Sequence, residues 1–122
     1  MASNQRLGKA LIKVDGQLLE SRPGAKLDIG GVVRDPVVGA NSVHGFAEKI
    51  KEAVVECEIS MGPETNIGAM AGWSDVTVVF ECDTGQVYTV RNAWLTEPPV
   101  VTAEEGGKVP LKFAGPPADL AI

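Results

Sequence analysis

Apolar and polar side chains alternate along several stretches of the chain, and this period of two predicts β-strands that bury one face. The clearest stretch covers residues 51–60. Its inward face would carry Ala53, Val55, Cys57 and Ile59. Its opposite face would carry Glu52, Glu56, Glu58 and Ser60. We therefore expect a strand with one buried face and one charged face.

Turn residues join other alternating stretches into hairpins. Asp15-Gly16 and Asp83-Thr84-Gly85 both combine residues that tolerate the backbone angles of tight turns. The pattern predicts strands on either side of each turn, at residues 9–14 and 17–20 and at residues 75–82 and 86–94. The inward face of the strand at residues 75–82 would carry Val76, Val78, Phe80 and Cys82. A closing strand is expected at residues 109–113, with Val109, Leu111 and Phe113 on one face.

One short helix is predicted over residues 63–71. Pro63 suits the first helical position, and Glu64 is favourable near the positive N-terminal end of a helix. Gly72 would end the helix, and Gly68 weakens it in the middle.

Residues 22–49 show no sustained period, and their glycines and prolines predict a long irregular arm with one short strand near residues 25–29. Several valines and Phe46 make this arm too apolar to be a disordered segment. Apolar side chains on such a segment indicate a surface that docks on a partner. The Pro- and Ala-rich tail, residues 115–122, is expected to be loosely held.

The length of 122 residues matches one domain, and we expect a single domain over residues 1–122. The elements above predict a mainly-β fold, a β-barrel or sandwich of about six or seven strands with one short helix and a long irregular arm.

The formal net charge of −5 argues against nucleic-acid or membrane binding, because both need clustered Lys and Arg. The first residues lack the apolar run of a secretory signal, and charges interrupt every apolar stretch before the roughly 18 residues of a membrane span. We expect a soluble protein made in a cytoplasm.

No pattern of catalytic, metal-binding or cofactor-binding residues is present. His44 lies in the Gly-rich arm, where an exposed or interface histidine is expected. Cys57 and Cys82 follow inward faces, so they are expected to be buried free thiols, with a disulfide between neighbouring strands as the alternative. Glu56 and Glu58 resemble a solvated strand face more than a glycosidase pair. The sequence therefore predicts no enzyme, no metal and no cofactor.

Over residues 8–116, the order of these elements resembles the order found in the tail tube proteins of Mu-like bacteriophages. The matching segments are GKALIKVDGQLL, GGVVRDPVVGANSVHGFAEK, KEAVVECEIS, PETNIGAMAGW, DVTVVFECDTGQVYTVRNAW and EGGKVPLKFAGP. The resemblance implies a subunit of six-membered rings that stack into a hollow tube, through which DNA leaves the capsid without specific binding. It also implies a place in the virion tail, assembly in the cytoplasm of the bacterial host, and contacts with sheath, tape measure, terminator or baseplate components.

Other settings stay open at this point. Related tubes occur in type VI secretion and in phage-derived bacteriocins. A monomeric or dimeric β-sandwich that acts as a binding or adaptor module is the alternative function.

The resemblance assigns the arm at about residues 30–45 to contacts with neighbouring subunits. The candidate contact residues are Val33, Arg34, Asp35, Val37, Val38, His44 and Phe46. A second candidate surface is acidic. If the strands at 51–60 and 75–82 pair, one sheet face would carry Glu52, Glu56, Glu58, Asp75 and Glu81. That face would either line the channel or form a solvated outer surface.

Overall fold

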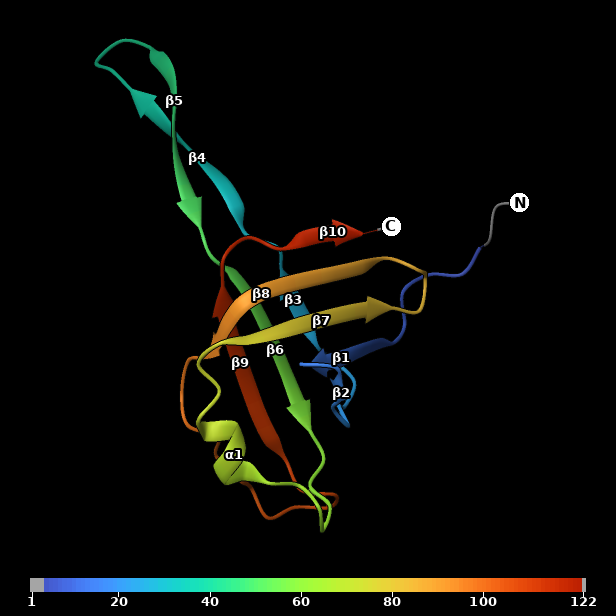
Figure 1. Ribbon diagram of the computed structural model, residues 1–122. Helices are drawn as coiled ribbons and strands as arrows, with labels where there is room; N and C mark the ends of the chain where they lie inside the picture. The colour runs from blue at the N-terminus through green and yellow to red at the C-terminus, as the bar shows by residue number, and fades with distance from the viewer. Residues whose placement is uncertain (1–3, 122) are drawn as a thin grey trace.

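The computed structural model describes residues 4–121, which form ten strands and one short helix (Figure 1). The first strands are β1 (Ala10–Val14), β2 (Gln17–Leu18), β3 (Lys26–Asp28), β4 (Gly31–Val38) and β5 (Val43–Lys51). The remaining elements are β6 (Ala53–Ile59), α1 (Ile67–Ala71), β7 (Val76–Cys82), β8 (Val87–Leu95), β9 (Val109–Gly115) and β10 (Asp119–Ala121). The expected mainly-β class is confirmed.

An 8-stranded antiparallel sheet, in the order β2-β1-β7-β8-β9-β6-β3 with β10 added to β8, folds over on itself. Strand β8 belongs to both halves, because its residues 87–93 pair with β7 while Trp94 and Leu95 pair with β9. A register shift against β7 and a positive φ of 53° at Asn92 mark the bend between the two halves. In Figure 1, β7 and β8 run across β6 and β9, so the body is a sandwich of two crossed layers.

The core lies between these layers and is built by the predicted alternation. Burial along β6 alternates through all seven residues, with Ala53, Val55, Cys57 and Ile59 inward. The facing layer contributes buried side chains that include Ile12, Val14, Val78, Phe80 and Val90. Phe113 of β9 is fully buried and stacks on Trp73, with ring centroids 5.8 Å apart.

Both predicted turns form and are tied to neighbouring segments. Asp15 and Gly16 have φ values of 50° and 82°, as a type I′ turn requires. The Asp15 carboxylate also accepts a 2.9 Å hydrogen bond from the Thr77 amide of β7. At the second turn, the Asp83 carboxylate accepts hydrogen bonds from the amides of Gly8 and Lys9. The same turn therefore fixes the N-terminal segment against the sandwich.

The helix is shorter than predicted, since it begins at Ile67 and not at Pro63. Asn66 is the N-cap, and its side chain accepts a 3.1 Å hydrogen bond from the Ala69 amide. Gly72 follows the helix as its C-cap, at the position predicted for its end.

The expectation of an irregular arm is wrong. Residues 31–51 form β4 and β5, an antiparallel hairpin that projects from the sandwich (Figure 1). The sequence pattern did not predict this hairpin, because almost every residue of both strands is exposed and no buried face requires apolar and polar residues to alternate. The short strand expected near residues 25–29 is confirmed as β3.

The tail was expected to be loosely held, and this is wrong for residues 119–121. They form β10, which pairs with β8 through Asp119, Leu120 and Ala121. Residue 122 lies outside the described residues.

The two thiols are free, but they differ in environment. Cys57 is buried, and burial together with the nearby Glu58 carboxylate raises the pKa of its thiol to about 12. Cys82 ends β7 and is only half-buried, so the expectation that it is buried is wrong. Burial and the Asp83 carboxylate raise the pKa of Cys82 as well.

A thiol reagent at neutral pH should therefore label Cys82 and leave Cys57 unmodified until the protein is denatured, because the thiolate is the reactive form. Mass spectrometry after native and denaturing labelling measures both sites. Rapid native labelling of Cys57 would contradict the inward facing of β6.

Candidate assembly surface

The arm, defined as β4 and β5, has two faces of different character. Residues opposite each other in the ladder share a face, because side chains alternate along each strand. One face, called the apolar face, carries Val32, Pro36 and Val38 of β4 and Val43, Phe46 and Ile50 of β5, with Arg34 and Glu48 between them. The other, called the charged face, carries the Asp35–Lys49 ion pair together with Val33, Val37 and Ala47, and it lacks an aromatic side chain.

The apolar face is open to solvent. Phe46 is 60% exposed and Ile50 is 74% exposed, and the valines of this face are also exposed. The Arg34 guanidinium lies over the Phe46 ring at 5.7 Å, and its Nε pairs with Glu48 Oε2 at 3.3 Å. These contacts stabilise the hairpin but leave its apolar side chains uncovered. A two-stranded hairpin is at best marginally stable alone in water, so this face favours a partner.

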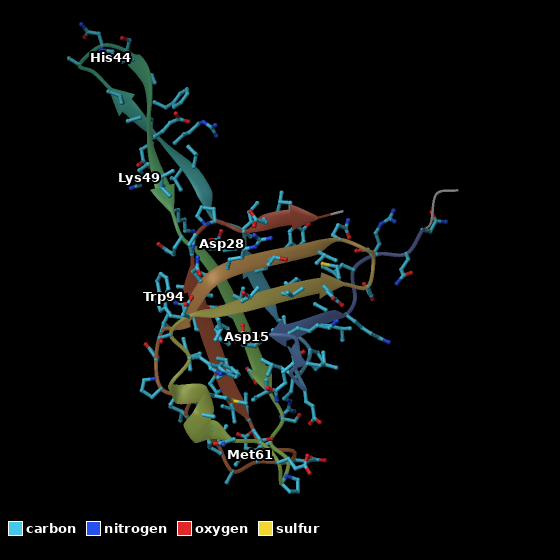
Figure 2. The ribbon with its side chains drawn as sticks, in the orientation of Figure 1. Asp15, Asp28, His44, Lys49, Met61 and Trp94 are labelled. Atoms are coloured by element: carbon cyan, nitrogen blue, oxygen red, sulfur yellow. The ribbon has the colours of Figure 1, made fainter. Side chains whose placement is uncertain are left out.

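The tip of the arm has a specific shape. His44 is the extra residue of a bulge, since Gly45 opposes Val37 while Val43 opposes Val38. A Cβ at Gly39 would meet the His44 imidazole at 2.2 Å, so Gly39 leaves room for the ring. Figure 2 shows His44 at the end of the arm farthest from the sandwich.

The base of the arm is a tight joint (Figure 2). The Asp28 carboxylate pairs with Lys51 Nζ at 2.5 Å and accepts a 3.0 Å hydrogen bond from the Gly30 amide. Gly30 has a φ of +71°, and a Cβ there would lie 2.7 Å from the Ala53 amide nitrogen. The ion pair with Lys51 and the Gly30 amide lower the pKa of Asp28, and Asp28 raises the pKa of Lys51. The joint sets the direction in which the arm leaves the sandwich.

All seven contact residues named from the sequence lie on this hairpin. Arg34, Val38 and Phe46 lie on the apolar face, whereas Val33, Asp35 and Val37 lie on the charged face and His44 at the tip. Sequence reasoning missed the partners Val32 and Ile50, and the joint at the base. Apolar residues at the even-numbered positions of β4, namely Val32, Pro36 and Val38, did indicate the apolar face, but Arg34 interrupts this alternation.

The predicted acidic surface required the strands at residues 51–60 and 75–82 to pair, and β6 and β7 do not pair. Strands β8 and β9 separate β7 from β6 in the sheet order. Glu56 and Glu58 lie on the outer side of β6, and Glu81 lies on the outer side of β7 in the other layer. Neither face is purely acidic. The role of these residues, with Glu52 and Asp75, in lining a channel stays a prediction.

Lysines accompany three of these carboxylates. Lys13 Nζ lies 3.0 Å from Glu81 Oε1, Lys108 Nζ lies 3.7 Å from Glu58 Oε2, and Lys112 Nζ lies 3.8 Å from Glu56 Oε1. Each such pair at the surface contributes little to stability, about 0–1 kcal/mol. Their main consequence is that both outer faces of the sandwich are of mixed charge.

Replacing Asp28 with Asn should loosen the joint, because the ion pair to Lys51 is lost. Hydrogen exchange at the Gly30 and Gly31 amides should accelerate by roughly two- to fivefold, while the core amides of β6 keep their protection. Asp35→Asn, which removes an ion pair from the middle of the arm, is the control. Equal exchange at these amides in the two variants would contradict the claim that the Asp28–Lys51 ion pair fixes the base of the arm.

The same ion pair predicts a pH window. The lowered pKa of Asp28 makes its contribution present above the ordinary value of 3.8 and lost as pH falls through the folded value. The raised pKa of Lys51 makes its contribution present below 10.5 and lost as pH rises through the folded value. Protection of the Gly30 amide, corrected for intrinsic exchange, should be constant between these limits. A transition inside the window would contradict the pairing.

Within residues 4–121, no helix is long and apolar enough to cross a membrane, and no group of three or more His, Cys, Asp or Glu residues is placed to hold a metal ion.

Comparison with known proteins identifies relatives of the whole sandwich and arm. The family model for the phage tail tube protein matches residues 3–119. The tail tube protein of Escherichia phage Mu is 38% identical over 91% of each chain. The Mu-like prophage FluMu tail tube protein of Haemophilus influenzae is 38% identical over 92% of each chain.

Among solved structures, the tube terminating cap of the anti-feeding prophage superposes with a TM-score of 0.70 at 10% identity, covering 99% of this chain and 94% of that one. At that identity the likeness concerns the fold. The relatives are structural proteins of phage tails, and no catalytic family is among the matches described. The chain belongs to the phage tail tube protein family and is a structural component of the virion tail.

Proposed function

We propose that copies of this chain form six-membered rings that stack into the hollow tube of a phage tail, and that phage DNA passes through this tube. Family membership supports a tube, and the resemblance to Mu-like tail tubes supplies the ring size. On this proposal the chain is not an enzyme. Its ends and outer wall would meet other tail proteins, such as sheath, tape measure, terminator or baseplate components.

The exposed apolar face of the arm is the observation that carries the assembly. The eight residues of β4 extend roughly 26 Å at about 3.3 Å per residue, well beyond the sandwich. Their apolar side chains have no core of their own, so burying them requires another chain. Because the arm leaves one end of an asymmetric body, it would meet a different surface on its neighbour. Such heterologous contacts build rings or stacks.

We further propose that a mixed-charge outer face lines the channel. On the outer side of β6, Lys108 and Lys112 each lie within 4 Å of a glutamate. A DNA phosphate would meet few lysines free to replace its counterions, and counterion release supplies most non-specific affinity for DNA. Because the carboxylates balance most of the positive charge of this face, it would attract the DNA backbone only weakly, and salt would screen that attraction beyond about 8 Å. A wall of this kind would let DNA slide.

Substitutions on the arm should separate assembly from folding. Val38→Ser combined with Phe46→Ser should give a folded protein that fails to polymerise, because both side chains are exposed in the single subunit. Val100→Ser is the control, since Val100 is 65% exposed and Val38 is 67% exposed. Native mass spectrometry and negative-stain microscopy should show hexamers, rings or rods for the natural protein and the control only.

Two outcomes would contradict the proposal. A natural protein that stays monomeric or dimeric at high concentration and in every salt condition would favour the adaptor module. Loss of cooperative unfolding in the arm variant would show that these side chains belong to the core.

Charge reversal tests the channel wall. Glu56→Lys with Glu58→Lys would leave the lysines of this face without their carboxylates, so tubes should assemble, bind DNA in a salt-dependent way and slow ejection. Glu104→Lys with Glu105→Lys makes the same change in charge in an exposed turn. If both variants leave DNA binding and ejection normal, the β6 face lies outside the channel.

A further inference from the structure

An apolar groove lies between the N-terminal segment and β2, next to the segment that leads into β3. Its volume is about 500 Å³, within the range of pockets that hold a large ligand group. Its apolar lining includes Leu7, Leu11, Leu18, Leu19, Ala25 and Phe80. Its polar lining includes Lys9, Glu20 and Arg22. Leu7, Leu11 and Leu18 are each about half exposed, so the groove presents apolar surface to solvent.

The walls of the groove are held in place by the fold. Asp83 binds the amides of Gly8 and Lys9 through its carboxylate, at 3.3 Å and 3.1 Å, and its own amide donates to the Lys9 carbonyl oxygen. On the other wall, the Leu19 amide donates to the Ile12 carbonyl oxygen at 2.9 Å. The groove is therefore preformed, which lowers the entropic cost of filling it.

The arm of the same chain is not placed to fill the groove. Strand β3 connects the two sites, since Ala25 lines the groove before the strand and Asp28 fixes the arm base at its end. Figure 1 shows the β1–β2 hairpin near the beginning of β3 and the arm leaving the body near the end of β3. A second copy displaced along this direction brings its arm toward the groove of the first. The contact would be head to tail.

The arm and the groove match in chemistry. Phe46, with Val38 and Val43 beyond it, forms an apolar end on the arm, and an aromatic side chain in an apolar pocket is the usual anchor of an interface. Arg34 and Glu48 lie two residue pairs nearer the base, about 7 Å from the Phe46 pair. With the anchor seated, this pair would lie near the polar lining of the groove, where Lys9 and Arg22 offer positive charge to Glu48 and Glu20 offers negative charge to Arg34.

We propose that this groove receives the apolar face of the arm from a second copy of the chain, with Phe46 seated among Leu7, Leu11 and Leu18. The proposal rests on the proposed function, because it names the surface that the arm contacts during assembly. It goes further by making the groove beside β2 of each subunit the receptor for the arm of the next. The exposed leucine-lined groove and the exposed apolar face of the arm then become a single buried interface.

Disulfide trapping in assembled tubes tests the proposal directly. In a Cys82→Ser background, which removes the half-buried native thiol, Leu18→Cys and Phe46→Cys are introduced together and the tubes are oxidised. A groove that holds the arm should give a ladder of covalent multimers on denaturing gels, because a disulfide needs Cβ atoms about 3.5–4.5 Å apart. Val100→Cys with Phe46→Cys, which uses an exposed position outside the groove, should give no ladder.

A ladder from the Val100 pair and not from the Leu18 pair would overturn the groove while leaving the tube intact. If the unsubstituted chain forms no tube, the proposed function fails first, and the groove proposal fails with it. If the Leu18 and Phe46 pair does not assemble, hydrogen exchange of unsubstituted tubes and monomers decides. Amides of residues 8–11 and 18–20 should gain protection on assembly, and unchanged exchange there would overturn the proposal.

A quantitative variant completes the test. Leu18→Glu places a charge in the groove and should raise the protein concentration needed for assembly by at least about tenfold, since hot-spot contacts dominate such interfaces. Val100→Glu, with the same change in charge, should alter that concentration less than about twofold. Equal effects of the two substitutions would contradict a seated arm.

Discussion

A two-stranded hairpin cannot bury its own side chains, and the proposed assembly of this protein depends on that constraint. Strands β4 and β5 satisfy each other's backbone hydrogen bonds along one edge only, and nearly all of their side chains face solvent. The core side chains of the other long strands are buried between two crossed layers, where each strand has a face to cover. The arm has no such layer, so its apolar face can be covered only by another molecule. The sandwich is folded and has its own core, whereas the arm carries an exposed apolar face that we propose is one side of an interface.

The joint at Asp28 determines how that interface is presented. A flexible tether would let the arm sample many directions and would impose an entropic cost when the arm docks. Here Gly30 leaves no room for a side chain against the backbone of β6, and Asp28 binds both Gly30 and Lys51. These contacts restrict the orientation of the arm before it contacts a partner. Preorganisation of this kind favours one repeating contact, which is what a regular tube requires.

The sequence predicted the long strands that bury a face and missed the two long strands of the arm, which bury none. Strand β6 and strand β9 were located because Val55, Ile59, Leu111 and their neighbours must alternate to fill a core. Strands β4 and β5 were read as irregular because exposure removes that requirement. The pairing of β6 with β9, and not with β7, depends on how β8 bends at Asn92, and local patterns do not encode such long-range choices. For this reason the predicted acidic surface separated into two faces, whereas the contact residues of the arm stayed together on one hairpin.

The claim that the arm builds the tube is tested most directly by a cryo-electron microscopy reconstruction of the assembled protein in which side chains are traced. Six subunits per ring, with Val38, Phe46 and Ile50 of every arm buried against a neighbouring subunit, are the expected result. A tube whose arms extend into solvent with these three side chains still exposed would contradict the claim, whatever the number of subunits in its rings.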